Sequence, residues 1–222
     1  MALTKFNYNS FDVTPVASKA LAFNSDADGF TTAAEGSMVL IKTLTASSDA
    51  TLDFVDGTDD VVLDNTYPTY VFKFINIHPE TNDTRLSVQA NAVGGSGFNE
   101  TITSTAIKSE HYENDGSAGV SYDTVNDQAQ GTGYQSLMTG DAVGSDNDQS
   151  GSGYLYLFGP SSTTFVKHFI ARMSHVGASD IQMDDIIGGH FDTTSAIDEI
   201  SFKMSSGDID AGQIKLYGIK DS

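Results

Sequence analysis

A short acidic segment near the amino terminus has the residue types and the spacing that bind a hard cation. Counted from Asn24 as position one, side-chain oxygens fall at positions one, three, five, nine and twelve, and a glycine falls at position six. This is the spacing of an EF-hand loop, in which such oxygens surround Ca²⁺. The segment therefore predicts a calcium site formed by Asn24, Asp26, Asp28 and Glu35.

The same segment has a second interpretation, as a turn rich in Asn and Asp. An EF-hand loop begins with Asp and carries an apolar β-branched residue at position eight, whereas here these positions hold Asn24 and Thr31. No amphipathic helical pattern flanks the segment on either side. Asn and Asp also favour tight turns, because their side chains hydrogen-bond to nearby backbone. Calcium is the only cofactor for which the sequence gives a motif.

The histidines and the remaining carboxylates show no pattern of a catalytic site. No two of the five histidines have the i, i+2 or i, i+4 spacing of metal ligands on one strand or one helix: His78, His111, His168, His175 and His190. His190 with Asp192, or Asp184 with Asp185, would act as acid and base only if distant groups converged on them. The sequence also lacks a Gly-x-Ser-x-Gly elbow. We expect a non-enzymatic protein with structural or surface histidines.

Three tyrosines in a polar stretch are candidates for contact with a sugar. Tyr112, Tyr122 and Tyr134 lie among Gly, Ser, Asn and Asp residues. Carbohydrate-binding modules commonly combine exposed aromatic rings with amide and carboxylate partners in loops. These polar surroundings therefore support a receptor-binding role for the three rings. The alternative is that they pack in the core or in a subunit interface.

The elements that must position these residues are short strands. No segment sustains the apolar i, i+3, i+4, i+7 stripe of a helix, and turn-forming residues interrupt the chain every ten residues or so. Residues 84–90 alternate between Leu86, Val88 and Ala90 on one side and polar residues on the other. Residues 200–204 alternate in the same way. These patterns predict strands with one core face and one wet face, and they make Phe202 a core residue.

Other segments refine this picture into an antiparallel β-sandwich with long polar loops. Residues 38–44, 70–77 and 154–158 carry apolar side chains on both faces, which indicates central strands or strands covered by a neighbouring subunit. Two stretches rich in Gly, Ser, Asn and Asp are predicted to be exposed loops, at 91–99 and 140–153. Residues 214–219 form a closing strand with Leu216 in the core.

Composition excludes several classes of partner. The chain has 222 residues, thirty acidic and eleven basic, and a formal charge of −19, so a phosphate backbone would be repelled over most of its surface. We expect no nucleic-acid partner and, because no long apolar run occurs, no membrane insertion. With no cysteine, durability must come from packing or oligomerisation. A change of composition near residue 46 divides an N-terminal attachment or oligomerisation section, 1–46, from a β-sandwich domain, 47–222.

Several long phrases of the sequence resemble a protein family. They occur in order over roughly two-thirds of the chain, which is more specific than a short motif. The phrases are YPTYVFKFINIHP (67–79), FNETITST (98–105), NDQAQGT (126–132), GPSSTTFVKHF (159–169), TTSAIDEISFKMSSG (193–207) and GQIKLYGI (212–219). On these phrases the chain resembles a β-rich domain of virion structural and tail-fibre proteins from marine tailed phages such as cyanophages.

The resemblance implies a place in a phage particle. It implies a jelly-roll-like sandwich in a virion assembled in the host cytoplasm, in contact with other virion proteins and without catalytic residues. By resemblance to phage fibres we expect a symmetric homo-oligomer, preferably a trimer. The expected function is that of a tail-associated fibre or adaptor, or of a head decoration protein. The alternatives are a carbohydrate-binding module that recognises a host-surface glycan and, third, a polysaccharide-degrading enzyme.

Overall fold

The computed structural model of the chain describes residues 21–23, 30–32 and 36–221, and all the regular secondary structure in these ranges is β-strand. The chain divides into two compact units, Met1–Gly36 and Ser37–Ser222. In the first unit, β1 (Leu21–Phe23) and β2 (Phe30–Thr32) form an antiparallel pair with Ala22 opposite Thr31. No helix that is long and apolar enough to cross a membrane occurs in the described ranges.

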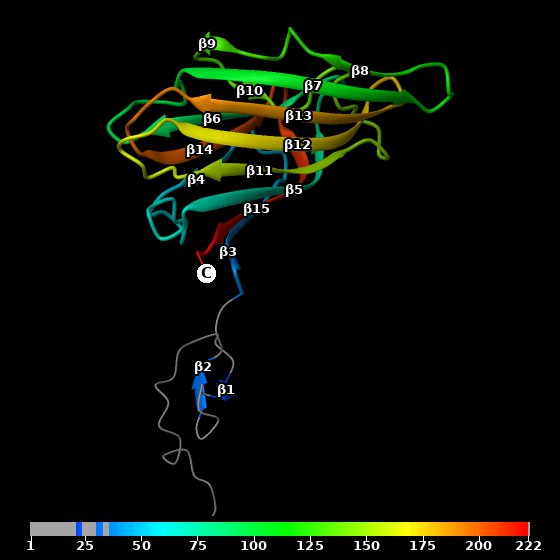
Figure 1. Cartoon of the computed structure of the whole chain (residues 1–222). Coiled ribbons are helices and arrows are strands. Elements are labelled where there is room, and N and C mark those ends of the chain that lie inside the picture. The colour runs from blue at the N-terminus through cyan, green and yellow to red at the C-terminus, as the bar shows by residue number, and fades with distance from the viewer. Residues whose placement is uncertain (1–20, 24–29, 33–35, 222) are drawn as a thin grey trace, which may run out of the picture. The chain divides into compact units, whose positions relative to one another are not determined.

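The second unit consists of two antiparallel sheets. The larger has nine strands, and in Figure 1 those from β7 down to β3 follow one below another. In spatial order they are β3 (Met38–Thr45), β15 (Ile209–Ile219), β5 (Thr69–Pro79), β11 (Gly151–Phe158), β12 (Lys167–Gly177), β13 (Ile181–Phe191), β7 (Ile102–Tyr112) and β8 (Ala118–Tyr122), with β9 (Ala129–Gly131) also paired to β7. The smaller contains β10 (Gln135–Ser136), β6 (Leu86–Ala92), β14 (Ile197–Met204) and β4 (Leu52–Val55).

The chain crosses repeatedly between the two sheets. It passes from β3 to β4 and back to β5, then to β6 and back to β7, and twice more through β10 and β14. Each crossing places the apolar face of a strand against the opposite sheet, which gives one shared core. The predicted all-β fold and the antiparallel β-sandwich are confirmed, while the jelly-roll topology remains a prediction.

The core is organised around a cluster of phenylalanine rings that joins the sheets. Phe202 on β14 lies 5.1 Å from Phe72 and 5.2 Å from Phe74 on β5, measured between ring centroids, and both pairs are edge-to-face. Phe54 on β4 meets Phe72 at 5.2 Å. Phe202 and Leu216 are both fully buried, which confirms that they belong to the core.

The prediction that residues 84–90 have one solvent-exposed face is wrong. All seven residues of β6 are buried, and Gln89 is 0% exposed. The Gln89 side-chain amide donates to the backbone carbonyls of Glu100, Thr132 and Gly133 at 2.8–3.1 Å. A polar side chain can be buried when its hydrogen bonds are satisfied, so polarity on one side of a strand did not indicate solvent here.

The two stretches predicted to be exposed polar loops are also partly buried and partly paired with strands. Residue 143 bridges to both Thr84 and Gly177, and Ala142 and Val143 are 0% exposed. Strand β11 begins at Gly151, inside the stretch predicted to be an exposed loop, and β6 extends through the beginning of the other one. These segments are held by backbone pairing, which does not depend on apolar side chains.

The N-terminal boundary lies before β3 and not after it. Strand β3 pairs with β15 in the larger sheet, with Leu44 opposite Ile214, and the second compact unit begins at Ser37. The section predicted as 1–46 is therefore divided between the two units. Its proposed attachment or oligomerisation role remains a prediction.

Lys167 occupies an inward-facing position on β12 and is 0% exposed. Its ammonium group donates to the carbonyls of Phe165 at 2.9 Å and Thr193 at 3.2 Å. The aliphatic stem can thus lie in the core while the charged end ties two loops together.

Candidate binding surface

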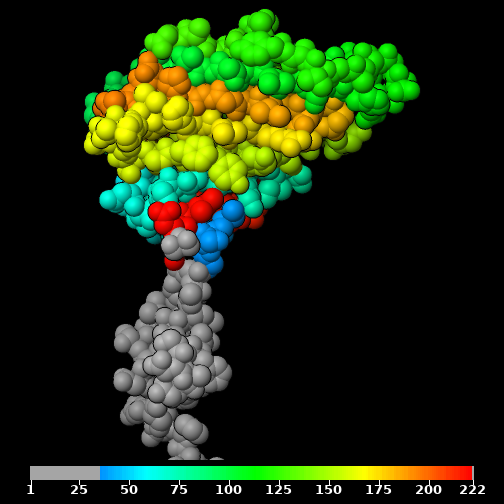
Figure 2. Space-filling model, viewed as in Figure 1, coloured from blue at the N-terminus to red at the C-terminus, as the bar shows by residue number. Residues whose placement is uncertain are grey.

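The surface of the larger sheet that faces away from the smaller sheet is called here the outer face. Strand β12 illustrates how the sequence divides the two sides: Phe169, Ala171 and Met173 are buried, whereas Ile170 and Arg172 are exposed. Strand β13 alternates in the same way over most of its length. In Figure 2, the side chains of β7, β13, β12 and β11 lie next to one another on the visible surface.

A contiguous apolar patch lies on this face. Ile186 on β13 is directly opposite Ile107 on β7, which is in turn opposite Tyr122 on β8. Ile170 on β12 lies opposite Gly188, which has no side chain to separate it from Ile186. The four side chains are 43–49% exposed. We call Ile107, Tyr122, Ile170 and Ile186 the apolar patch.

Cations and aromatic rings gather next to the apolar patch. Lys73 on β5 lies opposite Lys215 on one side and Tyr154 on the other. Its ammonium nitrogen is 5.1 Å from the centroid of the Tyr217 ring, a cation–π contact. Tyr154 is followed along β11 by Tyr156, with ring centroids 5.4 Å apart. We call Lys73, Lys215, Tyr154, Tyr156 and Tyr217 the cation–aromatic patch.

Negative charge is scarce on the outer face, although the chain as a whole carries −19. On β5, β11, β12 and β13, the described outward positions include one carboxylate, Asp184. Arg172 donates to its two oxygens at 2.8 and 2.7 Å, and these hydrogen bonds hold the pKa of the guanidinium above its ordinary value. The part of the outer face formed by β5, β11, β12 and β13 is therefore apolar to positive and matches a partner with acidic surface, whereas Glu110 and Asp127 add carboxylates at the β8 side.

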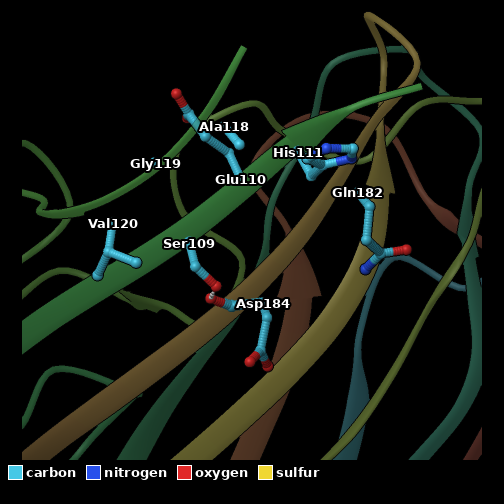
Figure 3. A pocket seen from close by; sticks show the side chains of 8 residues that line it. All are labelled: Ser109, Glu110, His111, Ala118, Gly119, Val120, Gln182 and Asp184. Atoms are coloured by element: carbon cyan, nitrogen blue, oxygen red, sulfur yellow. Dashed lines mark hydrogen bonds between the residues drawn. The ribbon is translucent and has the colours of Figure 1, made fainter. Parts of the chain in front are cut away.

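An open hollow of about 450 Å³ lies at the β8 side of the outer face, and Figure 3 shows the residues that line it. The Ser109 hydroxyl donates to the backbone carbonyl of Asp184 at 3.2 Å. Because the Asp184 carboxylate is already bound by Arg172, it is poorly placed to accept a proton from a substrate. Gln182, Glu110 and His111 also line the hollow, so it offers amide, carboxylate and imidazole groups to a ligand.

The candidate residues near the amino terminus cannot be placed. Asn24, Asp26, Asp28 and Glu35 lie outside the described residues. The calcium site and the alternative turn therefore both remain predictions.

The three candidate tyrosines are on different parts of the sandwich. Tyr122 lies on the outer face, and its hydroxyl donates to Asp127 at 2.6 Å. The Tyr134 hydroxyl bonds to Ser201 on β14 of the smaller sheet, and Lys203 lies 4.3 Å above the Tyr134 ring. Tyr112 ends β7, opposite Ile181. The rings do not form one platform, and their receptor-binding role remains a prediction.

An acid and a base with strongly shifted pKa values face each other inside the sandwich. The His175 Nδ1 and Asp185 Oδ2 atoms are 3.3 Å apart, and both side chains are 0% exposed. Asp185 also accepts hydrogen bonds from the backbone N–H and the hydroxyl of Thr139, at 2.9 and 2.6 Å. Burial lowers the pKa of His175 to about 4 and raises the pKa of Asp185 to about 7. With no surface exposed to a substrate, this pair is structural.

One of the acid–base pairs considered from sequence alone, Asp184 with Asp185, does not converge. Asp184 and Asp185 point to opposite sides of β13, one on the outer face and one in the core. Strand alternation makes this unavoidable for adjacent residues. The structure instead brings together His168 and His190, directly opposite each other on β12 and β13. Sequence spacing missed this contact, although the hairpin register could have revealed it.

Comparisons of the chain with protein-family models, with curated proteins and with solved structures found no match.

Proposed function

We propose that this chain is a non-enzymatic structural protein of a phage particle, and that it assembles with copies of itself through the outer face of its larger sheet. The apolar patch is the observation that carries the assembly proposal. The resemblance of several sequence phrases to phage virion proteins supports the place in a particle, as a tail-associated fibre or adaptor or as a head decoration. The lack of cysteine is consistent with durability obtained from subunit contacts.

The charges of the outer face favour a contact with a different surface of the neighbouring copy. If two outer faces met symmetrically, Lys73 and Lys215 of both copies would lie in the same interface. If the outer face meets a more acidic surface of the next copy, the charges are complementary. Contacts of this head-to-tail kind close into rings when the rotation allows it. This arrangement supports a cyclic homo-oligomer, and a trimer is the preferred number by resemblance to phage fibres.

Placing a charge in the apolar patch should separate the subunits. The Ile107→Glu variant is expected to weaken self-association by about tenfold or more, because its cross-strand neighbours Ile186 and Tyr122 would leave the buried carboxylate without a cationic partner. Sedimentation of the full chain over a range of concentrations measures this change.

Val125→Glu is the matched control, since Val125 is 85% exposed and lies outside the patch. It should sediment like the original chain. A full chain that stays monomeric both in solution and at its site in the particle would overturn the assembly proposal. If purified phage particles do not contain the protein, the proposed place in a virion is wrong.

The cation–aromatic patch favours a second candidate function, the binding of an acidic host-surface glycan. Lysines would pair with the carboxylate or sulfate groups of such a glycan, and tyrosines would contact its sugar rings. This candidate competes with the assembly proposal for part of the same face.

Removing charge from this patch tests the glycan candidate. The Lys73→Gln/Lys215→Gln variant should lower affinity for a sulfated or uronate-containing polysaccharide by about tenfold, with a smaller loss at high salt because salt screens exposed charges. Lys203→Gln is the control, since Lys203 also covers a tyrosine ring but on the smaller sheet. Equal binding by all three proteins would exclude the patch as the glycan site.

A further inference from the structure

Two histidine side chains meet on the outer face near one end of the larger sheet. His168 on β12 is directly opposite His190 on β13. Their ring centroids are 5.7 Å apart, and the ring planes are inclined by 57°. His168 is exposed and His190 is half-buried, so a small ion can reach the pair from solvent.

This geometry fits two imidazoles bound to one metal ion. With Zn–N bonds of about 2.0–2.1 Å, two imidazoles on a tetrahedral Zn²⁺ have ring centroids roughly 5–6 Å apart. The inclination of the rings means that they are not stacked face to face, which leaves nitrogen lone pairs free to converge on one position. Imidazole nitrogen suits Zn²⁺, Cu²⁺ and Ni²⁺, whereas Ca²⁺ and Mg²⁺ require oxygen ligands.

The surroundings of the pair also suit a cation. An open hollow of about 380 Å³ borders His168 and is lined mainly by apolar groups, among them Phe158, Phe165 and Val166. Apolar walls beside a metal limit the access of water to its ligands. Asp192 follows His190 by two residues and adds negative charge at the same end of β13.

We propose that His168 and His190 form a binding site for a divalent transition-metal ion, with Zn²⁺ as the reference ion. No group of three His, Asp or Glu side chains within the described part of the chain could hold a metal, so the pair supplies two ligands. Water, or a donor from another molecule, completes the coordination. The site is independent of the assembly proposal, because both histidines belong to the same chain.

Titration of the full chain with zinc chloride tests the site. Calorimetry should show one Zn²⁺ bound per chain, and the imidazole NMR signals of His168 and His190 should shift together during the titration. His168→Asn and His190→Asn should each weaken binding by about tenfold or more, because each removes one of two ligands. An excess of Ca²⁺ should not displace the Zn²⁺, which separates this site from the acidic segment near the amino terminus.

His111→Asn provides the matched control, since His111 is a separate exposed histidine on β7 whose Nε2 lies 3.4 Å from an Asp115 oxygen. This variant should bind Zn²⁺ like the original chain. Unfolding curves without metal should coincide for all four proteins, which shows that the substitutions do not act through the fold. The proposal is overturned if the original chain binds no Zn²⁺, if both pair variants keep full affinity, or if the NMR shifts occur at other histidines.

Discussion

Replacing Phe202 by alanine is expected to lower the free energy of unfolding by about 3–5 kcal/mol. The ring is 0% exposed and makes edge-to-face contacts with rings of β4 and β5, so the substitution removes contacts on both sides of the sandwich. The surrounding strands are hydrogen-bonded into sheets and can close only part of the cavity. Urea denaturation of the two proteins measures the difference.

Phe165→Ala is the matched control, because Phe165 is 72% exposed. It should change the free energy of unfolding by less than about 0.5 kcal/mol. If Phe202→Ala cost no more than this control, the two sheets would not share the core described above.

Single substitutions in the His175–Asp185 pair are expected to produce pH dependences of opposite sign. The His175 Nε2 atom faces the carbonyl of Asp141 at 2.8 Å and must carry a proton to donate to it. The Nδ1 atom then presents a lone pair toward Asp185. Because Nδ1 has no other hydrogen-bond partner, a protonated Asp185 is the group that can satisfy it.

In the original chain, this pair should contribute little pH dependence. Folded, it holds one proton between pH about 4 and about 7, on Asp185. Unfolded, it also holds one proton over nearly the same range, on histidine, since the reference pKa values are 3.8 for Asp and 6.5 for His. Stability changes with pH only where the folded and unfolded states bind different numbers of protons.

Asp185→Asn leaves a buried histidine whose pKa is lowered by desolvation. The unfolded state then binds a proton below pH 6.5 that the folded state does not accept until about pH 4. Stability relative to the original chain is therefore retained above pH 6.5 and lost as the pH falls toward 4, by on the order of 3 kcal/mol.

His175→Gln leaves a buried carboxyl whose pKa is raised by desolvation. The folded state now keeps a proton up to about pH 7 that the unfolded state releases near pH 3.8. Stability relative to the original chain is retained below pH 3.8 and lost as the pH rises toward 7, by on the order of 4 kcal/mol.

Urea denaturation between pH 4 and pH 7 measures both slopes as differences from the original chain, which removes the effect of other titrating groups. The double variant Asp185→Asn/His175→Gln should give a difference that does not vary with pH. Slopes of the same sign in the two single variants would contradict the description of the pair.

The strands could be predicted from the sequence because alternation is a local property. Leu86, Val88 and Ala90 face the core as expected. The burial of the other side of this strand could not be predicted, because the carbonyls that accept hydrogen bonds from Gln89 belong to residues 100, 132 and 133. The burial of Asp185 could not be predicted either, because Thr139 and His175, which contact its carboxyl group, lie on other segments of the chain.

The candidate surfaces could not be predicted from the sequence, because they depend on which strands are neighbours in the sheet. The apolar patch requires β12, β13, β7 and β8 to lie in that order, and β7 and β13 are far apart in the chain. In contrast, the histidine pair was accessible from sequence. A hairpin centred on the turn at residues 178–180 places each residue of β12 opposite a definite residue of β13, and it places His168 opposite His190.

The position of β15 has a consequence for how the protein folds. This strand is synthesised after every other described strand, yet it lies between β3 and β5 and pairs with both. Until it is complete, the facing edges of β3 and β5 have no final partner, and unpaired strand edges are prone to join other chains. Pairing between segments so distant in sequence is also slow. The larger sheet can therefore close only after β15 has been synthesised, and until then the nascent chain is exposed to misassembly with its neighbours.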